Sequence, residues 1–88
     1  MDRSELRELN ERADLAAAAE GAGAAVQIVD LLPSDVQPSG LRVVLSVFRL
    51  VDGVLHEATR NYRPARELTT VIERDTRELA MKLLTATR

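Results

Sequence analysis

The side chains that usually carry catalysis are few in this 88-residue chain and do not form a recognisable group. Paired carboxylates for acid–base chemistry must converge on one pocket, and the only acids on the expected strands are Asp30 and Glu57. The single histidine, His56, falls on an apolar strand face, where a structural role is more frequent than a catalytic one. The serines have no other base to pair with: Ser4, Ser34, Ser39 and Ser46. We therefore expect no enzyme.

The chain also lacks the side chains that hold most metals and covalent cofactors. It contains no cysteine, which removes disulfides and thiolate chemistry, and one histidine supplies very little metal-binding nitrogen. We therefore expect no metal site and no cofactor.

Arginine supplies eleven of the 12 basic residues, and three arginines predict a small anion-binding patch. Arg42 and Arg63 fall opposite each other in the hairpin described next, Arg66 follows shortly after, and Arg60 is a further candidate. Like charges directly across a sheet repel each other, so either an anion or an acidic side chain lies between the first two, or the strands have separated there. The formal net charge of −2 does not favour nucleic acid or an anionic membrane as the main partner.

These residues are positioned by a β-hairpin, the clearest structural signal in the sequence. Two β-prone runs, 41–51 and 54–63, flank the dipeptide Asp52-Gly53, which is typical of two-residue type I′ turns. Such a turn pairs the two residues that flank it and so fixes the register of the whole hairpin. Side chains then alternate between two faces, and the more apolar face is expected to pack against helices.

The other face of the hairpin is mixed, and an apolar patch on it predicts an interaction surface. The patch consists of Val44, Phe48, Leu50 and Leu55. Solvated monomers tend to avoid such patches, so we expect a second copy of the chain or another protein to cover it. Two alternatives remain open. The stems of neighbouring arginine and glutamate side chains could shield the patch in a monomer, or a partner strand could pair with the free edge of the first strand.

The remaining segments predict two helices and one further strand. Leucines and alanines at helical spacing predict a helix over 3–21 that ends at Gly21-Ala22-Gly23. A strand is expected over 24–32, followed by a polar, proline-bounded loop over 33–40. We interpret this loop as a linker, with a binding loop as the alternative. A second helix is expected over 64–87.

On the side away from its apolar stripe, the second helix carries charged residues and the first carries a leucine. In the second helix, opposite charges four residues apart predict ion pairs on a solvated face: Glu73–Arg77, Arg74–Glu78 and Glu78–Lys82. In the first helix, Leu15 lies opposite the stripe, and we interpret it either as a boundary residue or as a contact with a partner chain.

The order helix, strand, strand, strand, helix predicts a single α+β domain over 1–88. Short connections make the strands an antiparallel meander, with both helices packed on one face in a two-layer α-β-β-β-α fold. This order resembles that of the double-stranded RNA-binding domain, in topology alone. The resemblance implies RNA contacts at the start of the last helix, here Arg63-Pro64-Ala65-Arg66-Glu67. That stretch has two arginines but lacks the lysine cluster of the family.

These features predict a small, non-enzymatic protein-interaction module that forms a homodimer or serves as an adaptor or chaperone-like subunit. The alternative is a nucleic-acid or phosphate-binding domain that uses the arginine patch. No apolar run approaches the ~18 residues that a membrane span needs. The first residues do not resemble a signal peptide, so we expect a cytoplasmic protein.

Overall fold

The computed structural model describes residues 3–31, 40–63 and 68–87, and it confirms the predicted α+β class. In chain order the elements are α1 (Arg3–Ala19), β1 (Gly23–Leu31), β2 (Gly40–Val51), β3 (Val54–Tyr62) and α2 (Leu68–Ala86). The strands form one antiparallel sheet in the order β1-β2-β3. Most of the expected loop, and the expected first turn of the second helix at 64–67, lie outside the described residues.

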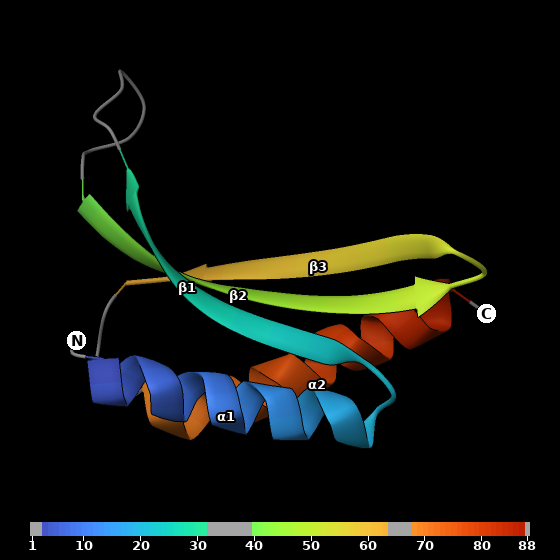
Figure 1. Ribbon diagram of the computed structural model, residues 1–88, viewed down its shortest axis with the longest axis horizontal. Coiled ribbons are helices and arrows are strands. Elements are labelled where there is room, and N and C mark those ends of the chain that lie inside the picture. Colours follow the sequence, from blue (N-terminus) through green and yellow to red (C-terminus); the bar gives the residue numbers. More distant parts are fainter. Residues whose placement is uncertain (1–2, 32–39, 64–67, 88) are drawn as a thin grey trace.

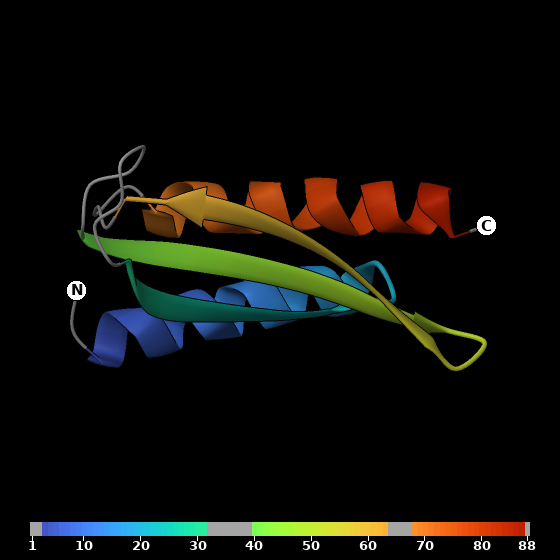
Figure 2. The same cartoon turned by 90° about the horizontal axis from the view of Figure 1, so that it is seen from above.

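Both helices lie on one face of the sheet, which confirms the expected two-layer arrangement (Figure 1). α1 packs against β1, whereas α2 packs against β2 and β3, and the helices contact each other. Seen from above, the two helices run in the same direction beneath the twisted strands (Figure 2). Because both helices occupy this face, no described helix or strand covers the opposite one, which we call the open face.

The turn between β2 and β3 has the conformation that its sequence predicts. Asp52 and Gly53 both have positive φ angles, 51° and 80°, as a type I′ turn requires. The register is also as predicted, from Val51 opposite Val54 to Val43 opposite Tyr62. β3 ends at Tyr62, one residue earlier than expected.

The end of α1 shows why this helix is shorter than the sequence pattern suggests. The helix ends at Ala19 rather than at residue 21, and Gly21 adopts a φ of 72°. The N–H of Ala22 donates to the carbonyl of Ala17 at 2.9 Å, and the N–H of Gly21 donates to that of Ala18 at 3.1 Å. This is a Schellman motif, which satisfies the last carbonyls of the helix and turns the chain into β1.

The core is aliphatic and lies between the sheet and the two helices. Its buried members come from α1, β1, β2 and α2: Leu9, Ala13, Ala17, Ala24, Val26, Val43, Leu45, Val47, Leu68, Ile72, Leu79, Ala80 and Leu83. The alanines of α1 add little apolar area but let the helix approach its neighbours closely. Ala86, which continues the expected apolar stripe of α2, is exposed because it closes the helix beyond the last core residue, Leu83.

Candidate functional site

The structure places the four residues of the predicted apolar patch on the open face, where Ser46 separates Val44 from the other three. Leu50 and Leu55 are directly paired across β2 and β3 next to the turn, and they are 68% and 60% exposed. On β2 and β3 this face consists of alternate residues: Arg42, Val44, Ser46, Phe48, Leu50, Leu55, Glu57, Thr59 and Asn61. β1 contributes Ala25 and Gln27, which pair with Ser46 and Val44. On β2, the residues that alternate with those of the open face point to the helix side and are completely buried: Val43, Leu45 and Val47.

Phe48 occupies a fixed place on the open face because of the glycine beside it. Gly23 of β1 is directly opposite Phe48, and the phenyl ring lies where a Cβ on this glycine would be. The ring therefore covers the bare main chain of β1, a known way to compensate for glycine in a strand. Even so, Phe48 remains 36% exposed, so it is available for a contact on its other side.

The predicted arginine patch is only partly described. Arg42 lies on the open face at the end remote from the turn, and its Nη1 donates to the carbonyl of Leu41 at 3.0 Å. Arg63 is exposed and follows the last residue of β3, so the pairing of the two strands ends one position before these arginines meet. Arg66 lies outside the described residues.

The outer edge of β1 is partly closed by a side chain of α1. The Nδ2 of Asn10 donates to the carbonyl of Val26 at 2.9 Å, and the N–H of Val26 donates to Oδ1 of Asn10 at 2.8 Å. Nδ2 also donates to the carbonyl of Leu6, one turn earlier in the helix. The asparagine amide thus takes the place that the peptide group of a neighbouring strand would occupy. The edge expected to be open is therefore blocked near its centre.

A polar cluster that the sequence analysis missed joins β3 to α2. The side chain of Asp75 is only 6% exposed. It accepts a hydrogen bond of 2.5 Å from the hydroxyl of Tyr62 and lies 3.2 Å from the nearest guanidinium nitrogens of Arg60 and Arg74. One feature of the sequence could have indicated this cluster. Asp75 is an acid inside the apolar stripe of α2, three residues after Ile72, and β3 carries a tyrosine and an arginine that could bind it.

The cluster shifts the pKa values of both groups that share the short hydrogen bond. Burial raises the pKa of Tyr62 above its ordinary value, and the hydrogen bond to the carboxylate of Asp75 raises it further. Burial also raises the pKa of Asp75, but the hydrogen bonds from Tyr62 and Arg74, together with the charge of Arg60, outweigh burial. The pKa of Asp75 is therefore lowered, and the carboxyl is ionised at neutral pH.

The charged residues of α2 do not pair along the helix as expected. Glu73 binds Arg12 of α1 at 3.2 Å, Glu78 binds Arg60 of β3 at 3.0 Å, and Arg74 binds its neighbour Asp75. The prediction of three pairs at i,i+4 spacing was wrong because arginines from α1 and β3 lie within reach of these acids. The two glutamates also mark the two flanks of α2, one toward α1 and the other toward β3.

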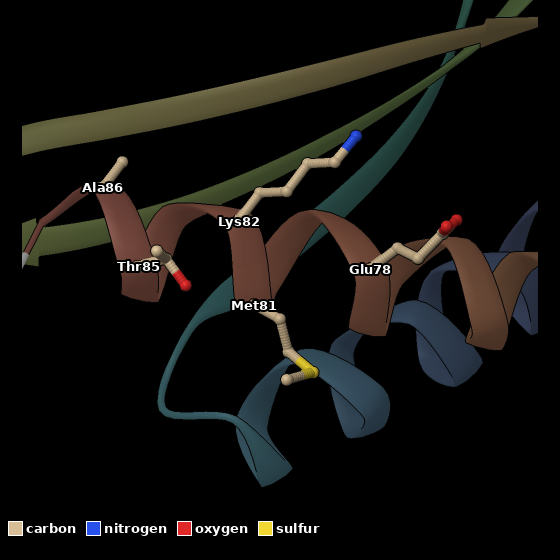
Figure 3. A pocket seen from close by; sticks show the side chains of 5 residues that line it. All are labelled: Glu78, Met81, Lys82, Thr85 and Ala86. Atoms are coloured by element: carbon tan, nitrogen blue, oxygen red, sulfur yellow. The ribbon is translucent and has the colours of Figure 1, made fainter.

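The flank of α2 toward β3 carries a shallow hollow that is open to solvent. Its volume is about 480 Å³, and it is lined by Glu78, Met81, Lys82, Thr85 and Ala86. In Figure 3 the side chain of Lys82 extends toward the strands, whereas Met81 points to the other side of the helix. The five residues come from one helix and are all exposed, so the hollow is a surface depression and not an enclosed site.

The one histidine considered for catalysis lies on β3, on the helix side of the sheet. His56 is opposite Arg49, as the register predicts, and Arg49 donates through Nη1 to the hydroxyl of Thr87 at 3.1 Å. Within 3–31, 40–63 and 68–87, no three histidine or acidic side chains are grouped closely enough to hold a metal ion. Neither α1 nor α2 is sufficiently long and apolar to cross a membrane.

Comparisons with known proteins provide no further guide to function. No protein-family model, no curated protein and no solved structure matches the chain.

Proposed function

We propose that this protein is a small, non-enzymatic interaction module that self-associates as a homodimer through its open sheet face. The observation that carries the proposal is the exposed apolar patch on a face that no described element covers. Leu50 and Leu55, at 68% and 60% exposure, are next to Phe48 along the face, and Val44 lies further along the same face beyond Ser46. Burial of such a patch against another apolar surface is favourable by roughly 25 cal/mol per Å² of area removed from water.

A second copy suits this face because a twofold axis can set the same apolar patch against itself. Phe48, Leu50 and Leu55 lie toward the turn, whereas Arg42 lies at the other end of the same strands. With the axis at the turn end, the apolar side chains of the two copies meet face to face. Arg42 of each copy then stays outside the apolar contact.

The alternative of nucleic-acid binding draws less support from the arrangement of charges. Arg12, Arg60 and Arg74 are all in ion pairs with carboxylates of the same chain. Their charge is therefore largely neutralised within the fold. Of the predicted patch the structure describes only Arg42 and Arg63, and two arginines are fewer than the phosphate contacts of a typical nucleic-acid interface.

The proposal is tested by sedimentation equilibrium of the wild type beside Phe48→Glu. We expect the wild type to associate and the folded variant to lose the open-face contact, with the dissociation constant of that contact raised about 100-fold, because a carboxylate would be buried without a partner. Leu15→Glu is the matched control, since Leu15 is 73% exposed on α1, away from the open face. This control should associate as strongly as the wild type. A wild type that stays monomeric at high concentration, or a Phe48→Glu variant of unchanged mass, would overturn the proposal.

A further inference from the structure

We infer that the free edge of β3 is a second self-association surface, which pairs antiparallel with β3 of another copy. The inference rests on the direction of main-chain groups. In a two-residue hairpin the residues next to the turn, Val51 and Val54, exchange hydrogen bonds, so the main chain of β3 points alternately toward β2 and outward. The outward N–H and C=O groups belong to Leu55, Glu57, Thr59 and Asn61, and each of these four residues is exposed.

The β3 edge lacks most of the devices that normally keep an edge strand from pairing. It is nine residues long, contains no proline and no lysine, and pairs with β2 without a bulge. Its one arginine, Arg60, is held by Asp75 and Glu78 on the helix side. β1, by contrast, has the amide of Asn10 across the main chain of Val26. Within the described residues, the fold therefore protects one edge of the sheet and leaves the other available.

The flank of α2 on the same side extends this surface. The ion pair between Glu78 and Arg60 places that flank next to β3, and the open hollow lies along it. A twofold axis perpendicular to the sheet would bring two such flanks together, with the helices antiparallel. Because each flank carries Glu78 and Lys82, both signs of charge are present on it, and antiparallel helices can match them.

The side chains of β3 are compatible with antiparallel pairing to β3 of a second copy. With the axis at Thr59, each threonine faces its counterpart, and Glu57 faces Asn61 of the second copy. On the helix side, His56 faces Tyr62 and Ala58 faces Arg60 of that copy. No like charges are then opposed, which removes the repulsion that disfavours many strand pairs.

The edge and the open face are independent surfaces, so their tests can be combined. The monomer mass is 9.7 kDa. With both surfaces active, the wild type should exceed a dimer at high concentration, since two different twofold contacts join four or more copies. Thr59→Pro removes an outward N–H without breaking the pairing with β2, and we expect it to weaken edge association at least tenfold. Thr59→Val is its control, since it changes the same side chain on the open face but keeps the N–H.

Sedimentation of the wild type, the two single variants, the double variant and the Thr59→Val control then separates the two proposals. We expect Phe48→Glu and Thr59→Pro each to form dimers, and the double variant to be a monomer. If Thr59→Pro has the mass of Thr59→Val, the edge inference is overturned, whatever the open face does. If Phe48→Glu has the wild-type mass, the open-face proposal fails and the edge inference stands.

Hydrogen exchange of the wild type provides a readout that needs no variant to fold. On association through the edge, the amides of Leu55, Glu57, Thr59 and Asn61 should become protected as the concentration is raised. Those of His56, Ala58 and Arg60 should be protected throughout, because they point toward β2. Outward amides that exchange equally fast at all concentrations would overturn the inference.

Discussion

The two edges of the sheet are both anchored to a helix, but by different chemical groups. At β1, the amide of Asn10 binds the main-chain N–H and C=O of Val26. At β3, the anchor consists of side chains, with Tyr62 and Arg60 bound to the carboxylate of Asp75. An anchor on the main chain uses the groups that another strand would need, whereas an anchor on side chains leaves them free. The choice of anchor thus decides which edge remains available for pairing.

The largest effect is expected from removal of the side-chain anchor. Asp75→Ala leaves the hydroxyl of Tyr62 without its acceptor and Arg60 with one acid fewer, at a site where the carboxylate is almost fully buried. We expect a loss of about 3 kcal/mol in the free energy of unfolding, measured by urea denaturation. Glu78→Ala is the control, since it removes an exposed partner of the same arginine and should cost about 0.5 kcal/mol. Equal losses in the two variants would contradict the assignment of Asp75 as the anchor.

Removal of the main-chain anchor should have a somewhat smaller effect on stability. Asn10→Ala leaves the N–H and C=O of Val26 without their partner, and we expect a loss of about 2 kcal/mol. Glu11→Ala, at the next position of α1, is exposed and should be nearly neutral. Unlike Asp75→Ala, Asn10→Ala should also increase association through β1, which sedimentation at several concentrations would detect. Unchanged stability would mean that Asn10 does not anchor β1.

A third, spectroscopic prediction concerns the hydrogen bond within the β3 anchor. Because the pKa of Tyr62 is raised in the folded state, the neutral phenol stabilises the fold below about pH 10, the ordinary tyrosine pKa. This contribution is lost as the pH rises above that value. The chain has one tyrosine and no tryptophan, so tyrosinate absorbance reports Tyr62 alone. We expect the folded wild type to ionise above the urea-unfolded chain, and Asp75→Asn to ionise at lower pH than the wild type. Identical titration curves for the two folded proteins would contradict the assigned hydrogen bond.

Local signals in the sequence were sufficient to predict the fold class and the patch on the open face. Asp52-Gly53 dictates its turn through positive φ angles, and this turn fixes the face on which each residue of β2 and β3 lies. The apolar alternation then identifies the helix side. The turn preference and the alternation of side chains depend only on residues close in sequence. They are therefore enough to predict that Val43, Leu45 and Val47 are buried.

Both anchors escaped prediction because they join residues that are distant in sequence. Asn10 and Val26 are 16 positions apart, and Tyr62 and Asp75 are 13 apart. Whether their atoms meet depends on how each helix sits against the sheet, which periodicity does not specify. The same reason explains the misassigned ion pairs of α2, where Glu78 binds an arginine of β3 instead of one in its own helix.

The most direct test of the difference between the two edges is native-state hydrogen exchange on wild-type protein diluted until it sediments as a monomer. The two amides to compare are those of Val26 and Thr59, one on each edge. We predict slow exchange at Val26, because its N–H donates to Asn10, and fast exchange at Thr59, whose N–H points outward. Asn10→Ala should raise the rate at Val26 to that at Thr59. Equal rates at the two amides in the wild type would contradict the view that the fold closes one edge and leaves the other open.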